Sequence, residues 1–469
     1  EPRVAAWLAS NAPFTSYLPQ CGGVAVDASL LHLAPLLAGA RRGLVVAGAL
    51  HSEPERLAAA AVAARLGWPL LPDINSGLRA PAHAAAAAAP LYDLLLASPD
   101  VARAAAPDVV LVVGGRLVSK RLQALVERRS VACVMVDSHA ERHDPAHCVT
   151  HRLAGDVAAI LAAIHARLPP TPPADAHPLR RLCDASAALD VALADALDAA
   201  LEPTAGIGEE EVAPTPPTAT QLSPVSSRGG EGAGSADADG GSDDGAAALP
   251  RLAVAEAWVA RQVCAVLCGR SDERRRQGRR DAARCDDLLF CSNSLPIRHL
   301  DMFCAAAPTV LSNRGASGID GILHTAIGAA LGGAAGGGSA TCLIGDLAAL
   351  HDLNALALLS NTPRTVVVVV LNNAGGAIFR YLPIAHSAVF SPYFDTPHAH
   401  RFEGVCRGFG LSYRVAATAA DLRAAYAAAL DAGGPAVVEV ITDKEDTYAL
   451  HQSCVALAAE VGTRVFLKG

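Results

Sequence analysis

The segment Ile344-Gly345-Asp346-Leu347 ends one apolar, strand-like run of the sequence, and Asn372-Asn373-Ala374-Gly375-Gly376 ends the next one. The residues between them leave room for one helix and one strand, which is the βαβ unit of a parallel sheet. Parallel strands end at the same edge of a sheet, and ligands bind at that edge. We therefore expect Asp346 and Asn373 to lie close together in a ligand-binding site.

These two polar segments carry the oxygen ligands that magnesium prefers. An aspartate carboxylate, an asparagine amide oxygen and a backbone carbonyl suit the octahedral geometry of Mg²⁺, which commonly shares its ligands with phosphate groups. A helix that begins at Asp346 would add backbone amides for a diphosphate. A capping aspartate followed by an asparagine turn would use the same residues, so this pattern alone leaves both interpretations open.

The rest of the chain repeats the alternation of buried strands and helices, which predicts an α/β fold with two doubly wound parallel-sheet domains. Strands are expected at residues 44–48, 109–114, 131–137, 288–292, 341–345, 365–371 and 436–442. Helices are expected at residues 53–66, 117–126, 176–201, 253–267, 319–331 and 347–359, and again near the C-terminus. The charged residues 269–286 are expected to form a surface loop.

A segment of different composition separates the two α/β units. Residues 203–249 are rich in Pro, Thr, Ser and Gly and contain eight acidic residues and one arginine, with few large apolar side chains. Such a segment cannot bury enough surface to offset its ordering entropy, so a disordered linker is predicted. The expected organisation is a Rossmann-like domain at 1–170, a connecting helix at 171–202, the linker at 203–250 and a second domain at 251–469.

The composition of the 469 residues argues against several classes of protein. Hydrophobic residues make up 52% and aromatic residues 4%, which favours helices and buried parallel strands over an aromatic-rich β-sandwich. The net charge of −8 argues against a general nucleic-acid binder, and no apolar run is long enough to span a membrane. The 12 cysteines include no Cys-x-x-Cys pair, so most are expected to be reduced and buried.

Further motifs surround the two polar segments and narrow the interpretation. They are Ser292-Asn293-Ser294-Leu295-Pro296-Ile297-Arg298, Ser312-Asn313-Arg314-Gly315-Ala316-Ser317-Gly318-Ile319-Asp320-Gly321, His351-Asp352-Leu353-Asn354, Gly115-Arg116-Leu117-Val118-Ser119-Lys120-Arg121 and Asp144-Pro145-Ala146-His147. Together they resemble the 2-succinyl-5-enolpyruvyl-6-hydroxy-3-cyclohexene-1-carboxylate synthase (MenD) family, the thiamine diphosphate (ThDP) enzymes of menaquinone and phylloquinone biosynthesis. The resemblance covers nearly the whole chain except residues 203–249 and the insertion near 270–286.

The resemblance implies a ThDP-enzyme architecture in which residues 1–170 form the central domain and 251–469 the diphosphate-binding domain. It implies ThDP and Mg²⁺ (or Mn²⁺) as cofactors, with the metal held by Asp346, Asn373 and the Gly375 carbonyl. Ile319 matches the apolar residue that supports the bent form of ThDP. The other residues that match the family's cofactor site are Gly345, Leu347, Gly376, Ile378, Phe379 and Leu382.

The resemblance also implies a reaction with two dicarboxylate substrates. ThDP would promote decarboxylation of 2-oxoglutarate, and the resulting succinyl carbanion would add to isochorismate in a 1,4-addition. Arg298 and Arg314 match arginines that bind carboxylates, because a planar guanidinium can hold a carboxylate through two hydrogen bonds. Ser294 matches a hydroxyl that contacts substrate, and Lys120 with Arg121 matches a pair on the isochorismate side.

The family has a third domain, which binds the pyrimidine of ThDP and supplies a glutamate for its activation. We expect this domain to come from upstream sequence or from another chain, and this chain alone to be slow or inactive. Family ThDP sites form between subunits, so a homo-oligomer is expected. The Ala-rich composition and low-complexity linker suggest an algal or plant plastid protein within a multifunctional chain; otherwise a cytoplasmic location is expected.

Three alternatives remain beside this interpretation. Another ThDP enzyme, such as a 2-oxoacid decarboxylase or acetohydroxyacid synthase, would share Asp346 and Asn373 but would not need Arg298 and Arg314. An inactive fragment that acts as a partner would keep the fold without turnover. A plain NAD-binding domain is disfavoured, because no Gly-x-Gly-x-x-Gly segment follows a strand.

Overall fold

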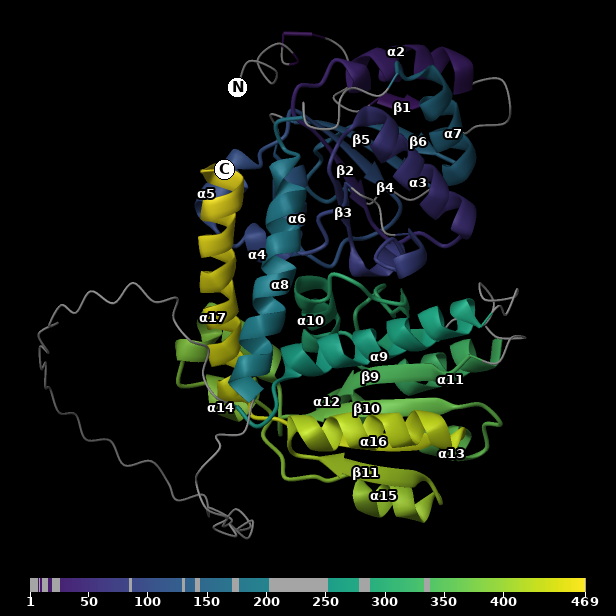
Figure 1. Cartoon of the computed structure of the whole chain (residues 1–469), viewed down its shortest axis with the longest axis vertical. Helices are drawn as coiled ribbons and strands as arrows, with labels where there is room; N and C mark the ends of the chain where they lie inside the picture. The colour runs from purple at the N-terminus through teal and green to yellow at the C-terminus, as the bar shows by residue number, and fades with distance from the viewer. Residues whose placement is uncertain are drawn as a thin grey trace, which may run out of the picture.

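The computed structural model describes residues 7, 9–10, 16–18, 26–83, 87–128, 131–139, 144–170, 177–201, 252–277, 287–332 and 338–468. The predicted disordered linker at 203–250 lies outside these residues. Within them the chain forms two six-stranded parallel sheets, each covered by helices on both faces (Figure 1). The α/β fold with two doubly wound parallel sheets is therefore confirmed.

The first sheet has the strand order β1-β6-β5-β4-β2-β3. Its strands are β1 (Ser16–Leu18), β2 (Gly43–Ala47), β3 (Leu70–Pro72), β4 (Val109–Val113), β5 (Ala132–Asp137) and β6 (Val149–Ala154). Helices α2 (Val26–Ala38), α3 (Glu53–Leu66) and α7 (Val157–Arg167) cover one face. Helices α4 (Tyr92–Leu95), α5 (Pro99–Ala104) and α6 (Lys120–Val126) belong to the apolar cluster on the other face.

Alternate residues of each inner strand serve opposite faces of this sheet. In β4, Val110 and Val112 belong to one buried apolar cluster, and Leu111 and Val113 belong to the other. Side chains of a strand alternate between the two faces, so a strand that is covered on both sides must be apolar throughout. This requirement explains why the continuous run Val109–Val113 could be recognised in the sequence.

The second sheet has the order β11-β12-β10-β9-β7-β8. Its strands are β7 (Leu288–Cys291), β8 (Thr309–Leu311), β9 (Ala340–Gly345), β10 (Val366–Asn372), β11 (Ser412–Ala416) and β12 (Ala436–Ile441). One face packs against α9 (Glu256–Arg276), α10 (Leu295–Phe303) and α16 (Ala419–Ala432), and the other against α11 (Ile322–Gly332), α13 (Ala355–Ser360) and α15 (Glu403–Gly408).

Two long helices join the sheets. Helix α8 (Arg181–Leu201) runs from the first sheet beside α17 (Lys444–Val461), as Figure 1 shows. One continuous apolar cluster includes buried residues of both sheets and of both helices. Arg261 of α9 donates hydrogen bonds to Asp190 of α8 at 2.7 Å and to the Phe303 carbonyl at 2.7 Å. The two sheets are therefore packed as one body rather than as separate units on a tether.

The helical regions differ from the sequence expectation at three places. The connecting helix expected at 176–201 begins only at Arg181, after a turn at residues 178–180. Helix α9 does not end near residue 267 but continues to Arg276, so residues 269–276 are not a loop. Its last turns contact the core, because Arg274 donates to the fully buried Asp287 at 3.0 Å. The helix expected at 347–359 is two short helices, α12 (Asp346–His351) and α13, separated by a turn at residues 352–354.

The remaining elements are short. They are the 3₁₀ turns η1 (Ile74–Ser76), η2 (Pro81–His83), η5 (Ala377–Tyr381) and η6 (Pro383–His386), helix α14 (Phe390–Tyr393) and the π-helical turn η7 (Gly462–Leu467). None of the helices within the described part of the chain is long and apolar enough to cross a membrane.

Candidate ThDP and metal site

A cavity of about 320 Å³ lies at the edge of the second sheet where β9 and β10 end. Strand β9 ends at Gly345, and α12 begins with Asp346; β10 ends at Asn372, and Asn373 follows. The predicted residues that line the cavity are Ser294, Arg298, Arg314, Ile319, Gly345, Asp346, Leu347, Asn373, Gly375, Gly376, Ile378 and Phe379. The structure thus brings together residues from four separate sequence motifs.

Asp346 is buried, and its carboxylate accepts hydrogen bonds from backbone amides of two segments. One carboxylate oxygen accepts a hydrogen bond from the Leu347 amide at 2.6 Å, and the other accepts one from the Gly375 amide at 3.1 Å. His398 Nε2 lies 3.2 Å from the second oxygen. Burial raises the pKa of Asp346, while the backbone hydrogen bonds and His398 lower it. The turn between β10 and η5 therefore holds Asp346 against the segment that follows Asn373.

Asn373 presents one polar atom without a protein partner. Its Nδ2 donates to Glu256 Oε1 at 2.6 Å, whereas its Oδ1 is buried and accepts no hydrogen bond. Buried polar atoms are nearly always satisfied, so an orphaned oxygen beside a buried carboxylate requires a partner. A hard divalent cation fits that requirement, since carboxylate, amide and carbonyl oxygens are its usual ligands. The residues present therefore fit Mg²⁺ or Mn²⁺.

Glycines allow the backbone to approach this site closely. A Cβ atom on Gly375 would lie 2.3 Å from the Asp395 carbonyl oxygen, and one on Gly376 would lie 2.6 Å from the Phe394 carbonyl oxygen. Ala374 between Asn373 and Gly375 has a φ of 60°, which residues with a Cβ atom, other than asparagine and aspartate, rarely adopt. Any residue larger than glycine at position 375 or 376 would displace the turn that carries Asn373.

The cationic side of the cavity comes from the beginning of α10 and the loop after β8. Arg314 donates to Asn293 Oδ1 at 2.9 Å, and Arg298 donates to the Ser294 carbonyl. Burial and the nearby Arg314 charge lower the pKa of Arg298. Two guanidinium groups that share one cavity repel each other unless an anion lies between them, so this side suits a carboxylate-bearing ligand.

Three predicted site residues are not among the described residues that line this cavity. Leu382 is 44% exposed and lies at the start of η6. Lys120 and Arg121 begin α6, where Arg121 forms an ion pair with Asp93 at 2.6 Å. The Asp93 charge also acts on Arg298, so the pair lies near the cavity on the side of the first sheet.

An acidic residue that lines the cavity lies outside every motif from which the site was predicted. Glu256, the first residue of α9, is 1% exposed and accepts hydrogen bonds from Asn373 and from Thr442 Oγ1. Burial raises its pKa to about 7. Its position in the sequence is 117 residues from Asn373, and an acidic residue in a first helical turn is common on helix-dipole grounds alone. Nothing local in the sequence distinguishes it.

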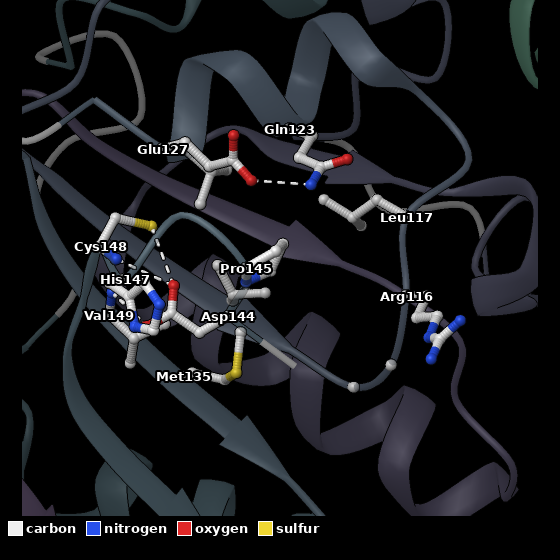
Figure 2. Close-up of a pocket in the computed structure, with 14 residues that line it drawn as sticks. Arg116, Leu117, Gln123, Glu127, Met135, Asp144, Pro145, His147, Cys148 and Val149 are labelled. Atoms are coloured by element: carbon white, nitrogen blue, oxygen red, sulfur yellow. Dashed lines mark hydrogen bonds between the residues drawn. The ribbon is translucent and has the colours of Figure 1, made fainter. Parts of the chain in front are cut away.

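A second, larger cavity of about 560 Å³ lies between α6 and the first sheet (Figure 2). Gln123 donates to Glu127 at 2.7 Å on one wall, and Asp144 accepts from the Cys148 amide at 2.9 Å on the other. None of the predicted site residues is among the described residues that line it. It is therefore separate from the cavity at Asp346.

Two parallel sheets with a polar cavity at the carboxyl edge define the class of ligand-binding α/β proteins. The family described as "Middle domain of thiamine pyrophosphate" matches residues 2–194, and "Thiamine pyrophosphate enzyme, C-terminal TPP binding domain" matches residues 299–440. A solved structure, the Rhodococcus jostii RHA1 thiamine diphosphate-dependent 4-hydroxybenzoylformate decarboxylase, has a TM-score of 0.53 over 94% of this chain and 68% of its own. Its sequence is only 17% identical, so this similarity supports the fold and not a shared activity.

Curated relatives narrow the class. The 2-succinyl-5-enolpyruvyl-6-hydroxy-3-cyclohexene-1-carboxylate synthase of Rubrobacter xylanophilus is 38% identical over 96% of this chain and 66% of its own length. The synthase of Salinibacter ruber is 34% identical over 98% of this chain and 66% of its own length. Protein PHYLLO, chloroplastic, of Arabidopsis thaliana is 27% identical over 89% of this chain and 22% of its own length. The chain belongs to this synthase family, as its motifs predicted, and spans just under two thirds of the bacterial relatives.

Proposed function

We propose that the chain carries the diphosphate- and metal-binding part of a 2-succinyl-5-enolpyruvyl-6-hydroxy-3-cyclohexene-1-carboxylate synthase. The reaction is decarboxylation of 2-oxoglutarate and 1,4-addition of the remaining four-carbon unit to isochorismate. One observation carries the proposal: Arg298 and Arg314 face the same cavity as Asp346 and Asn373. A ThDP site for a monocarboxylate such as pyruvate would not need two half-buried cations beside the metal ligands.

In this proposal each group of residues has a separate task. Asp346, Asn373 and the Gly375 carbonyl hold the metal, and the amides at the start of α12 face the diphosphate. Bound ThDP supplies an electron sink for the electrons released on loss of CO₂. Arg298 and Arg314 bind the substrate carboxylate distant from the reacting carbon, and Ser294 orients it. Arg121, held by Asp93, and Lys120 bind isochorismate from the first-sheet side.

A further domain would complete the site. Ile319 lies at the cavity, and both Ile319 and Leu382 expose 44% of their surface, although cofactor sites are largely apolar and enclosed. We propose that a pyrimidine-binding domain, from additional sequence or another chain of a homo-oligomer, covers these side chains. Residues 1–170 then serve as the central domain and 251–469 as the diphosphate-binding domain. A plastid location follows if the protein comes from a plant or alga, and a cytoplasmic one otherwise.

The test compares substrates in the presence of ThDP and Mg²⁺. The chain is mixed with the pyrimidine-binding domain of the Rubrobacter xylanophilus relative, and CO₂ release is measured with 2-oxoglutarate or pyruvate, with and without isochorismate. We expect turnover of 2-oxoglutarate, and a rise in its KM of roughly tenfold or more in R298K and R314K, because lysine cannot form the bidentate contact. The surface variant R103K serves as the control, since Arg103 is 77% exposed.

Two outcomes would contradict the proposal. Pyruvate turned over as well as 2-oxoglutarate would indicate another 2-oxoacid decarboxylase. No turnover of either substrate with the added domain, while ThDP and metal still bind, would indicate an inactive partner chain. The chain without the added domain is expected to release CO₂ slowly or not at all, because a proton-transfer group contributes roughly 10²–10⁴-fold to a rate.

A further inference from the structure

Two consecutive asparagines at the end of β10 are each held by a different buried glutamate. Asn372 Nδ2 donates to Glu439 Oε1 of β12 at 2.7 Å, and Asn373 Nδ2 donates to Glu256 Oε1 of α9 at 2.6 Å. The glutamates are 0% and 1% exposed, respectively. Glu439 holds Asn372 inside the sheet, whereas Glu256 holds Asn373 at the cavity wall, so the two contacts have different consequences.

The contact with Glu256 decides which end of the Asn373 amide faces the cavity. A carboxylate oxygen accepts hydrogen bonds and cannot donate one, so it must meet the NH₂ end of the amide. The oxygen end then points away from Glu256, and this is the buried Asn373 Oδ1 that has no protein partner. An amide rotated by half a turn would direct two N–H groups at the metal position, and these cannot coordinate a cation.

The protonation state of Glu256 does not alter this argument. Its Oε1 accepts from both Asn373 and Thr442 Oγ1, at 2.6 and 3.3 Å. A proton on Glu256 would therefore reside on Oε2, which lies 3.5 Å from His299 Nδ1. Oε1 remains an acceptor for the amide in either case.

The beginning of α9 is itself firmly placed, so Glu256 can act as a fixed reference. Trp258 is 1% exposed, donates to Asp198 of α8 at 3.3 Å and lies beneath the Arg423 guanidinium, 4.9 Å from the ring centre. Positioning through a second layer of residues needs such rigidity, because a mobile partner could not select one amide orientation.

We propose that Glu256 is a positioning residue that fixes the Asn373 amide with its oxygen toward the divalent metal. The inference rests on the proposed function, because it presupposes the metal that ThDP requires at Asp346 and Asn373. Glu256 touches neither substrate nor cofactor in this role. It acts through Asn373 alone, and the exchange of donor and acceptor between the two residues should preserve the effect.

The test measures the Mn²⁺ dissociation constant of the full chain, mixed with the added pyrimidine-binding domain and ThDP, from the electron paramagnetic resonance signal of free Mn²⁺. E256A should weaken Mn²⁺ binding roughly 10–100-fold, the usual effect of losing a residue that orients a metal ligand. N373D should weaken it as well, because it places two carboxylates 2.6 Å apart. The double variant E256Q/N373D restores a donor–acceptor pair with reversed polarity and should regain native affinity within about threefold.

The matched control is E439Q, which alters the neighbouring glutamate–asparagine contact but leaves the cavity residues unchanged. It should lower the unfolding temperature and keep the Mn²⁺ affinity. Native affinity in E256A, no gain in the double variant over N373D, or an equal loss in E439Q would each overturn the positioning role. Failure of the unaltered chain to bind Mn²⁺ with ThDP would instead overturn the proposed function itself.

Discussion

Arg79, in the loop after β3, forms an ion pair with Asp301 of α10 at 2.6 Å, and both side chains are only 1% exposed. The guanidinium also donates to the carbonyl oxygens of Pro72, Asp301 and Cys304 at 2.8–2.9 Å. This contact joins the first sheet to the helix that begins after Ser294 and carries Arg298. The geometry of the cationic side of the cavity therefore depends on a contact between the two sheets.

Replacement of Arg79 by methionine should destabilise the fold strongly. R79M would leave the Asp301 carboxylate buried without its charge partner, which typically costs about 3–5 kcal/mol. R79K should also be destabilising, because one ammonium group cannot satisfy the four acceptors that the planar guanidinium reaches. Urea unfolding followed by circular dichroism measures both. R103A, which breaks the exposed Arg103–Asp100 pair, should cost less than about 1 kcal/mol, and equal losses in R79M and R103A would contradict the prediction.

Replacement of Ser294 by glycine should stabilise the folded chain. Its φ of 72° and ψ of −134° lie in a region that residues with a Cβ atom seldom occupy, at a cost of about 1–3 kcal/mol. S294G should therefore raise the unfolding temperature, whereas S294A keeps the strain and should not. With the added pyrimidine-binding domain, both variants should turn over 2-oxoglutarate more slowly than the native chain, because they lose the hydroxyl. A lower unfolding temperature in S294G than in S294A would show that the backbone there is not strained.

The strands that are covered on both faces could be predicted from the sequence, and so could the edge of the sheet where they end. Runs such as Val109–Val113 and residues 366–371 of β10 are apolar throughout because both faces are buried. Strands β3 and β8, of three residues each, carry too little pattern to be recognised. Helix α9 was cut short because its last turn, with Arg274, is charged although Arg274 pairs with buried Asp287.

The site was predictable where one motif supplies several of its residues, and not where partners come from distant segments. Asp346 and Asn373 meet because each follows a parallel strand, which follows from topology alone. Glu256 reaches Asn373 only through the packing of α9 on the second sheet, and no local pattern encodes that packing. The ion pair of Arg121 with Asp93 depends on the packing of α6 against α4 in the same way.

Removal of the Asp346 carboxylate should abolish stabilisation by metal without unfolding the chain. In the presence of ThDP, Mg²⁺ at about 100 times its dissociation constant should stabilise the native chain by about 2.7 kcal/mol, and EDTA should reverse this. D346N should show no Mg²⁺-dependent rise in the unfolding temperature. The control is D352N, because buried Asp352 accepts from the Leu323 amide at 2.6 Å outside the cavity. D352N should be less stable yet retain the Mg²⁺ response; the opposite pattern would exclude Asp346 as a ligand.

Two histidines that are buried in the neutral form should each make a destabilising contribution in mild acid. Burial lowers the pKa of His299 to about 3 and that of His451 to about 4. The unfolded chain, with ordinary histidines near 6.5, binds more protons than the folded chain below that pH. Their contribution is therefore complete above about pH 6.5 and is lost as the pH falls toward 4. At pH 5 each histidine should reduce the free energy of unfolding by about 2 kcal/mol relative to pH 7.

The variant H451F isolates one of these two contributions. His451 lies between the rings of Phe303 and Tyr381, with centroid separations of 6.2 and 4.8 Å, and its buried Nδ1 has no hydrogen-bond partner. A phenyl ring can occupy this site without a group that titrates, so the loss between pH 7 and pH 5 should be smaller by about 2 kcal/mol in H451F. Urea unfolding at both pH values measures the difference, with the exposed His351 replaced in H351F as the control. Equal losses in H451F and the native chain would mean that His451 gains its proton without unfolding, which its position between two aromatic rings disfavours.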